Sequence, residues 1–204
     1  MSLRPGAHAI EHPVPGCVQD LSRFELPAGF RGKPSWYVQL WWVVQALLFR
    51  PSPMFMYGWR NWLLRRFGAS IGAGVRVRPS AHITYPWKVK IGDWSWIGEE
   101  SVLYSLEHIV IGSNVSLSHR CYLCAGTHDY TKPEFPYVMD PAKTRIVIED
   151  ETWLANDVFV GPGVSIGRGC VVGARSNVFH SLPEMMVCYG TPAEAKGPRI
   201  PKSR

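Results

Sequence analysis

One histidine of this sequence, His128, stands where a regular pattern breaks off. From Ile71 to Leu123, Ile, Leu or Val recurs at six-residue spacing in triplets, with two extra residues between triplets, and the pattern returns only at Ile148. Between them lie the 18 residues HDYTKPEFPYVMDPAKTR at 128–145, which follow no such period. An imidazole that titrates near neutral pH can take a proton from a hydroxyl that attacks a carbonyl carbon. We therefore predict that His128 is a general base at the root of a protruding loop.

The cysteines are a second group of residues with chemical potential. Cys121 and Cys124 form a C-x-x-C motif, but the sequence has five cysteines and no second pair that would complete a zinc site. Both also lie within the six-residue frame, Cys121 at a small inward position. We expect them to be reduced packing residues of a cytoplasmic protein, and we expect no bound metal.

The elements that would position His128 follow from the six-residue pattern. A period of six is neither that of an α-helix nor a simple strand alternation. It is typical of a parallel β-helix, in which each short side points one large and one small side chain inward. All large positions are Ile, Leu or Val, although only 45 of the 204 residues are of these types. They are Ile71, Val77, Ile83, Ile91, Ile97, Leu103, Ile111, Leu117, Leu123, Ile148, Leu154, Val160, Ile166, Val172 and Val178.

A second regularity supports the same fold. The residue four positions after a large one is small, except at Trp87, Glu107 and Leu182, which all fall on the third side of a triplet. The small set is Val75, Ala81, Ser95, Ser101, Val115, Cys121, Thr127, Thr152, Val158, Val164, Cys170 and Ser176. The triplets predict an all-β domain at 69–183, a parallel β-helix of about five coils.

The residues before the repeats predict a helical hairpin at 35–68. The segment WYVQLWWVVQALLF at 36–49 is almost wholly apolar but too short to span a bilayer, which needs about 20 residues. Pro51 and Pro53 would end a helix there, and the stretch 59–67 then combines aromatic residues with arginines. The hairpin either covers the open end of the β-helix or lies at a membrane interface.

Charge is distributed unevenly along the chain. The net charge is +6, yet no Asp or Glu occurs between Glu25 and Asp93, where ten Lys and Arg residues lie. This asymmetry suits an anionic partner such as a membrane surface, or else reflects a solvated basic face. We expect no nucleic-acid partner. Residues 1–34 are expected to form an irregular arm without a secretory signal, and 184–204 a closing tail.

These motifs have a recognisable counterpart. The chain resembles the hexapeptide-repeat acyltransferases, which fold as left-handed β-helices, and within them the colanic-acid or exopolysaccharide type of sugar O-acetyltransferase, kin of the galactoside, maltose and nodulation enzymes. The matching segments are the repeats at 71–178, CYLCAGTHDYTKPEF at 121–135, DETWLANDVFVGPGVSIGRGCVVGARS at 150–176 and YGTPAEAKG at 189–197. The resemblance implies transfer of an acetyl group from acetyl-CoA to a sugar hydroxyl in exopolysaccharide biosynthesis.

The resemblance also implies roles for residues. His128 matches the catalytic base of the family, and coenzyme A is implied to lie between adjacent β-helices of a homotrimer. The positions implied to contact coenzyme A are Trp153, Ala155, Asn156, Ala174 and Arg175. The chain departs from the family at Phe179-His180, where relatives commonly have Thr-Lys, and at Glu194, where they often have a basic residue. Those basic residues usually meet the nucleotide end of coenzyme A.

The acceptor is less well determined. The aromatic side chains of Tyr130 and Phe135 on the loop, and of Trp96 in the second coil, could stack on a sugar face. The N-terminal hairpin points to a lipid-linked sugar and to a peripheral position at the inner face of the cytoplasmic membrane.

Two other functions stay open on the sequence. A zinc hydratase of the γ-carbonic-anhydrase type would use the same fold and three histidine ligands shared across a subunit interface. The candidates are His82, His108, His119, His128 and His180. The other alternative, a β-helix that only scaffolds other proteins, would bind no acetyl-CoA.

Overall fold

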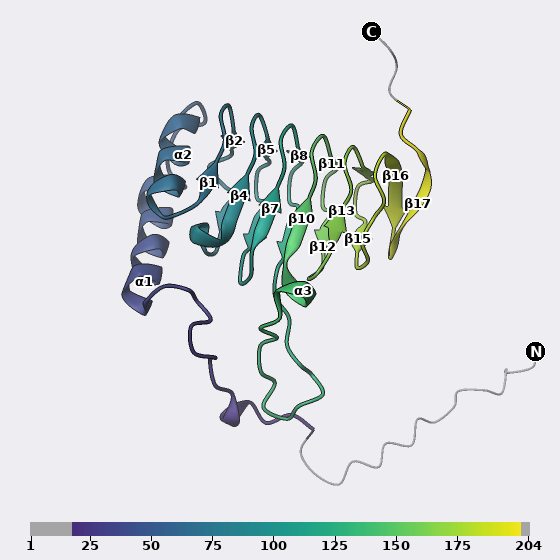
Figure 1. Ribbon diagram of the computed structural model, residues 1–204. Helices are drawn as coiled ribbons and strands as arrows, with labels where there is room; N and C mark the ends of the chain where they lie inside the picture. The colour runs from purple at the N-terminus through teal and green to yellow at the C-terminus, as the bar shows by residue number, and fades with distance from the viewer. Residues whose placement is uncertain (1–17, 201–204) are drawn as a thin grey trace, which may run out of the picture.

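The computed structural model describes residues 18–200 and shows a three-sided, left-handed parallel β-helix (Figure 1). Each side is one parallel sheet, which we call sheets A, B and C. Sheet A consists of β1 (Ser70–Ile71), β4 (Val89–Ile91), β7 (Ile109–Ile111), β10 (Ile146–Ile148) and β13 (Ser165–Ile166). Sheet B consists of β2 (Arg76–Val77), β5 (Trp96–Ile97), β8 (Ser116–Leu117), β11 (Trp153–Leu154), β14 (Val171–Val172), β16 (Met186–Gly190) and the antiparallel β17 (Ala193–Pro198). Sheet C consists of β3 (His82–Ile83), β6 (Val102–Tyr104), β9 (Tyr122–Cys124), β12 (Phe159–Val160) and β15 (Asn177–Val178).

The six-residue period produces the core directly. All fifteen large positions are buried, and they stack in register from coil to coil, as Ile71, Ile91 and Ile111 do in sheet A. Between strands the small inward residues leave room for the chain to turn. Ser95, for example, is fully buried, and its hydroxyl donates to the Gly112 carbonyl at 2.7 Å. The predicted fold class is therefore confirmed.

The stack is slightly longer than the predicted five coils. Leu182 forms a parallel bridge to Ile166 in sheet A, and β16 pairs with β14 in sheet B, so two sides of a sixth turn are present. Ile166 and Leu182 are 16 residues apart in the chain, and so are Val172 and Cys188. In the preceding coil the paired residues Ile148 and Ile166 are 18 apart. The shortened turn shifts the frame, so the sequence pattern ends at Val178 although the solenoid continues.

The helical hairpin covers the first coil. It consists of α1 (Ser35–Val44), a π-helical turn η2 (Gln45–Phe49) and α2 (Tyr57–Arg66), and its buried side chains join the solenoid core. Trp41 donates from Nε1 to the Ile83 carbonyl at 2.8 Å, and Gln45 accepts the Ile83 N–H at 2.8 Å. The strand edge that the first coil would leave open is thus hydrogen-bonded by the hairpin.

Arg60 is the central side chain of this cap. It is fully buried and donates to the Val77 carbonyl of β2 at 2.7 Å. Its guanidinium also donates to Pro53 and Met54 carbonyls at 2.8 and 2.7 Å and to the Ser52 hydroxyl at 2.9 Å. A single charged group therefore joins the α2 helix, the turn before it and the first coil.

The N-terminal arm from residue 18 packs against the protruding loop. It contains the short 3₁₀-helix η1 (Leu21–Arg23), whose N-cap Asp20 donates from its backbone N–H to the Pro133 carbonyl at 2.8 Å. Arg23 forms an ion pair with Glu134 at 2.8 Å. The loop itself contains α3 (Pro141–Thr144), and a 3₁₀ turn, η3 (Pro86–Lys88), occupies the same corner two coils earlier. Within residues 18–200 no helix is both long and apolar enough to cross a bilayer.

Replacing Arg60 with Met tests the cap. The variant leaves the buried Val77 carbonyl oxygen and two part-buried carbonyl oxygens without this donor, so we expect the free energy of unfolding to fall by about 2–4 kcal/mol. Arg66→Met, on the exposed side of the same helix, is the control and should cost less than about 0.5 kcal/mol. Thermal unfolding followed by circular dichroism measures both. Equal melting temperatures for the two variants would show that the Arg60 contacts do not stabilise the cap.

Candidate active site

His128 lies in the corner between sheets C and A, where the loop leaves the solenoid. Its backbone forms an antiparallel bridge with Tyr137, and the Val138 N–H donates to the Thr127 carbonyl at 3.0 Å. The half-buried imidazole is sandwiched between two rings of the loop. The Phe135 ring lies 4.2 Å away at an interplanar angle of 10°, and the Tyr137 ring lies 4.1 Å away at 32°.

A hydrogen bond determines the proton arrangement of this ring. Nδ1 of His128 lies 2.7 Å from the Phe135 carbonyl oxygen. A carbonyl oxygen can only accept, so Nδ1 carries the proton that forms this bond. In the neutral ring the lone pair is then on Nε2. The loop thus holds an imidazole whose Nε2 can accept a proton from another molecule.

The neighbouring residues of His128 contribute less than the rings do. The Asp129 carboxylate accepts from Thr131 through both its N–H, at 3.1 Å, and its hydroxyl, at 2.5 Å. These bonds hold the pKa of Asp129 below its usual range, and they direct the carboxylate to Thr131. The Tyr130 side chain is 81% exposed, whereas the Phe135 ring stacks on His128.

The N-terminal arm completes the surroundings of His128, which no sequence motif predicts. Phe30 stacks on Tyr137 with 4.2 Å between ring centroids, and Phe24 meets the edge of Tyr137 at 5.7 Å and His128 at 6.1 Å. A cavity of about 340 Å³ opens beside His128, lined in part by Tyr104 of β6. Phe24 and Phe30 lie about a hundred positions from the loop, and no periodic pattern links the two segments.

The residues predicted to contact coenzyme A gather at another corner, between sheets B and C. Ala155, Asn156, Ala174 and Arg175 follow β11 and β14, and Arg175 donates its backbone N–H to the Asn156 carbonyl at 2.9 Å. Trp153 lies just before this corner on the outer face of sheet B, 46% exposed, and donates from Nε1 to the Ser118 hydroxyl at 3.0 Å. The structure therefore brings these five residues together.

Two features of this corner suit an elongated anionic ligand. The side chains of Ala155 and Ala174 are single methyl groups, and Ala174 is exposed. A ligand can therefore approach the backbone closely at this corner. Among the described residues, no hydrogen-bond partner is found for the Arg175 guanidinium, while Arg199 donates to the Glu151 carbonyl at 2.8 Å and Lys196 pairs with Glu194 at 2.8 Å. Arg175 is the cation best placed to meet a phosphate.

The corner with His128 and the corner with Arg175 lie at opposite ends of the sheet C strands. The B–C corner precedes each strand of sheet C, whereas the loop follows the end of β9. One chain does not bring the two groups together. Between them a ladder of aromatic rings runs along the outer side of sheet C, with centroid distances of 6.2, 6.0 and 5.8 Å. Its members are Tyr104, Tyr122, Phe159 and Phe179.

Trp96, the third aromatic side chain predicted to contact an acceptor, is not near His128 of the same chain. It lies on the outer face of β5, 51% exposed, and Arg76 of β2 stacks on it at 4.9 Å. Of the cysteines in residues 18–200, Cys121, Cys170 and Cys188 are buried in the core, whereas Cys124 is half-buried at the cavity beside His128; Cys17 lies outside the described residues. Burial raises the pKa of Cys121 to about 11, so it is a thiol at neutral pH. In the described part of the chain, no three His, Cys, Asp or Glu side chains converge as a metal site.

Comparison with known proteins agrees with this geometry. Residues 145–180 match the family model for bacterial transferase hexapeptide (six repeats). Over 176 residues the chain is 53% identical to WcaF of Escherichia coli (strain K12), named as a colanic acid biosynthesis acetyltransferase, covering 86% of this chain and 94% of WcaF. The chain belongs to the hexapeptide-repeat acetyltransferases. The resemblance to this family that the sequence motifs indicate is thus confirmed.

Solved structures of this family share the fold at lower identity. A hexapeptide-repeat acetyltransferase of Vibrio cholerae O1 biovar eltor, complexed with acetyl coenzyme A, is 22% identical and superposes with a TM-score of 0.70 over 85% of this chain and 88% of its own. A galactoside acetyltransferase in complex with coenzyme A is 21% identical, with a TM-score of 0.74 over 86% and 85%. Membership in the hexapeptide-repeat acetyltransferases favours an acyl-CoA-dependent enzyme over the zinc hydratase and the scaffold.

Proposed function

We propose that this acetyltransferase transfers the acetyl group of acetyl-CoA to a sugar hydroxyl of an exopolysaccharide precursor, with His128 as the general base. The observation that carries the proposal is the hydrogen bond from Nδ1 of His128 to the Phe135 carbonyl, which leaves Nε2 available as a base. The 53% identity to a protein named for colanic acid biosynthesis supports the acceptor class.

The reaction needs only one protein group that moves a proton. Nε2 of His128 takes the proton of the sugar hydroxyl while the hydroxyl oxygen forms a bond to the thioester carbonyl carbon. The carbon–sulfur bond then breaks, and the leaving thiolate recovers the proton from the imidazolium. No covalent bond to the enzyme forms, so the protein needs no nucleophile of its own. Stacking by Phe135 and Tyr137 keeps the ring oriented throughout.

The B–C corner is the place that we assign to acetyl-CoA. Ala155 and Ala174 would allow the pantetheine arm to run along the backbone, and Arg175 and Asn156 would meet polar groups of the cosubstrate. Trp153 offers a flat, half-exposed ring at the same corner. The basic residues that relatives have at the positions of Phe179-His180 and Glu194 are missing here. Arg175 is therefore the principal phosphate contact in this assignment.

We further propose a homotrimer with active sites between subunits. His128 and the B–C corner lie at opposite ends of the strands of sheet C. A complete site therefore requires the loop of one subunit and the B–C corner of the next. The aromatic ladder on sheet C, with Tyr122 and Phe179 at 36% and 50% exposure, offers the apolar surface that such an interface would bury. Cyclic symmetry would give three identical sites.

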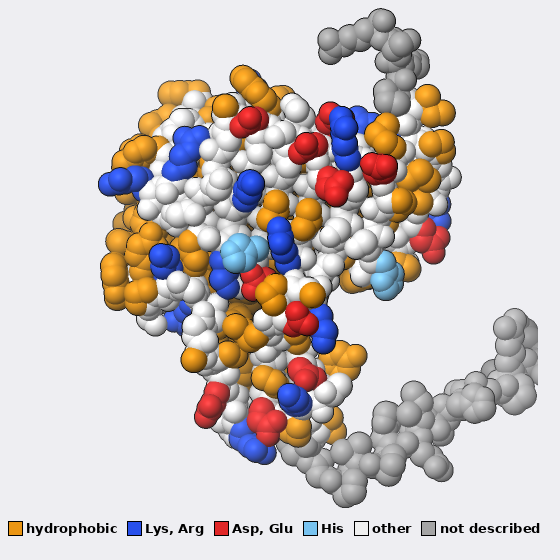
Figure 2. All heavy atoms as spheres, in the orientation of Figure 1, with side chains coloured by type: hydrophobic (Ala, Val, Ile, Leu, Met, Phe, Trp, Pro, Cys, Tyr) orange, Lys and Arg blue, Asp and Glu red, His pale blue; other side chains and the backbone are white. Residues whose placement is uncertain are grey.

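The hairpin supports a peripheral position at the inner face of the cytoplasmic membrane. Figure 2 shows hydrophobic side chains, with Lys and Arg among them, at the end of the molecule where α1 and α2 lie. The exposed apolar set is Trp36, Leu40, Trp42, Val43, Leu47, Leu48, Met54, Phe55 and Trp62. Arg50, Arg65 and Arg66 flank it, and the sequence has no acidic residue there. Apolar side chains ringed by cations suit an anionic bilayer surface.

Replacing His128 with Ala tests the chemistry. Loss of a general base should lower kcat about 10²–10⁴-fold while the binding of acetyl-CoA is retained. The release of free thiol in the presence of sugar acceptors measures turnover, and calorimetry measures binding. Tyr130→Phe, at the exposed loop position beside the site, is the control for general disturbance of the loop. A His128→Ala enzyme with wild-type turnover would contradict the assignment.

Mixing two inactive variants tests the shared site. His128→Ala removes the base, and Ala174→Trp blocks the B–C corner; each homotrimer should be inactive. After co-refolding in equal amounts, about a quarter of the interfaces pair an intact His128 with an intact corner, so about a quarter of the activity should return. If each site were built within one chain, no activity would return.

Flotation with vesicles tests the membrane contact. We expect the wild-type protein to bind vesicles of phosphatidylethanolamine and phosphatidylglycerol, and to dissociate at high salt. Phe55→Glu, at a side chain 79% exposed on the hairpin, should weaken binding at least about tenfold. Ile200→Glu, at an 81% exposed side chain far from the hairpin, should bind as the wild type does. Equal binding by both variants would exclude the hairpin as the contact.

A further inference from the structure

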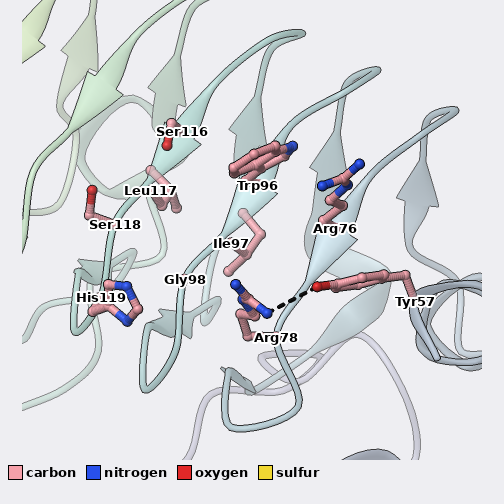
Figure 3. A pocket seen from close by; sticks show the side chains of 10 residues that line it. All are labelled: Tyr57, Arg76, Arg78, Trp96, Ile97, Gly98, Ser116, Leu117, Ser118 and His119. Carbon is pink, nitrogen blue, oxygen red and sulfur yellow. Dashed lines mark hydrogen bonds between the residues drawn. The ribbon is translucent and has the colours of Figure 1, made fainter. Parts of the chain in front are cut away.

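A second pocket lies on the outer face of sheet B, between the first three coils and the start of α2 (Figure 3). Its volume is about 260 Å³, and a shallower hollow of about 500 Å³ adjoins it along the same face. Arg76 and Trp96 line both. Arg78, His119 and Tyr57 line the deeper part. Among residues 18–200, no Asp or Glu lines either hollow.

Aromatic side chains contact both arginines of this pocket. The Arg76 guanidinium lies over the Trp96 ring at 4.9 Å and over the Tyr57 ring at 6.0 Å. Arg78 donates from Nη1 to the Tyr57 hydroxyl at 3.0 Å, as the dashed line in Figure 3 shows. Neither arginine forms an ion pair with any of the described residues. Arg76, oriented by ring faces, keeps its N–H donors for an anion, and Arg78 keeps those that Nη1 does not use.

A histidine and the two arginines share the pocket. His119 lines it, and Nδ1 of its ring lies 3.9 Å from a carboxylate oxygen of Glu99. Arg76 and Arg78 are two positions apart on one short chain segment, so two guanidinium groups with five N–H donors each face one small volume. Two neighbouring forks of this kind match a ligand with two adjacent phosphates better than a single phosphate or a carboxylate.

The adjoining hollow supplies the second part of a ligand site. Trp94 and Trp96, 62% and 51% exposed, present aromatic surface beside Asn114 and Ser116, which offer polar groups. This combination suits a sugar or another ring that is attached to the charged group. The pocket also shares sheet B with Trp153 at the corner assigned to acetyl-CoA, and it opens next to the turn that carries Met54 and Phe55.

We infer that this pocket binds the diphosphate group of the acceptor, a sugar diphosphate, through Arg76 and Arg78. The identification of this ligand as the acceptor rests on the proposed function. The binding of a diphosphate group in this pocket does not depend on it. A nucleotide sugar and a polyprenyl diphosphate sugar carry the same group, and they differ in what is attached to its far side.

Calorimetry without acetyl-CoA tests the site on the full-length protein. Inorganic pyrophosphate, UDP-glucose and farnesyl diphosphate are the probes, and glucose is the neutral comparison. We expect the diphosphates to bind the wild type, Arg76→Gln or Arg78→Gln to weaken each at least about tenfold, and the double variant about a hundredfold. Tighter binding of farnesyl diphosphate than of UDP-glucose identifies the lipid-linked source, and the reverse order identifies the nucleotide source.

A charge-matched control separates the site from general attraction to a basic protein. Arg66→Gln combined with Lys90→Gln removes two charges from exposed positions outside the pocket and should leave pyrophosphate binding within about twofold. Circular dichroism confirms that each variant is folded. Absence of pyrophosphate binding to the wild type, or equal binding by the Arg76/Arg78 and Arg66/Lys90 double variants, would overturn the inference.

The outcome is distinguishable from a failure of the proposed function. His128→Ala should bind pyrophosphate as the wild type does. If diphosphates bind but no sugar is acetylated, the site stands and the proposed reaction fails. If sugars are acetylated but the Arg76/Arg78 double variant takes sugar diphosphates with an unchanged KM, the reaction stands and the inference fails.

Discussion

Coil-to-coil hydrogen bonding is the constraint on which the rest of this structure depends. In residues 18–200 every strand is two to six residues long, and the strands of the coils pair only with strands of adjacent coils, so no coil is stable alone. The inward position of each strand must therefore hold a buried aliphatic side chain, and both ends of the stack must be closed. Arg60, Trp41 and Gln45 close one end, and the β16–β17 pair closes the other.

Because the stack is so regular, variation is confined to its corners and outer faces. The C–A corner already accepts two extra residues in each of the first two coils, where they form η3 in the first, and it accepts the whole loop in the third. The loop does not disturb the core, since β7 and β10 pair across it in unbroken register. A catalytic histidine can be placed there at little cost in stability, and its orientation then depends on the loop and the arm.

The three outer surfaces differ in chemistry as a result. Sheet C carries an aromatic ladder, the first coils of sheet B carry arginines on aromatic rings, and the hairpin carries apolar side chains flanked by cations. In the proposed assembly these surfaces become a subunit interface, an acceptor pocket and a membrane contact. Each remains rigid relative to the others because one continuous solenoid supports them all.

The sequence by itself determined the frame of the solenoid. Each short strand must bury one large aliphatic side chain, and this requirement appears in the sequence as a six-residue period of Ile, Leu and Val. The sequence also singled out His128, since an insertion in a strict repeat is visible without any structure. The tertiary structure alone decided the shortened sixth turn, the sandwich of His128 between Phe135 and Tyr137, and the contacts of Phe24 and Phe30 with the loop. It alone also placed Tyr57 beside Arg76 and Arg78. These contacts join segments distant in the chain through side-chain shape and hydrogen bonding, which follow no period that a sequence can display.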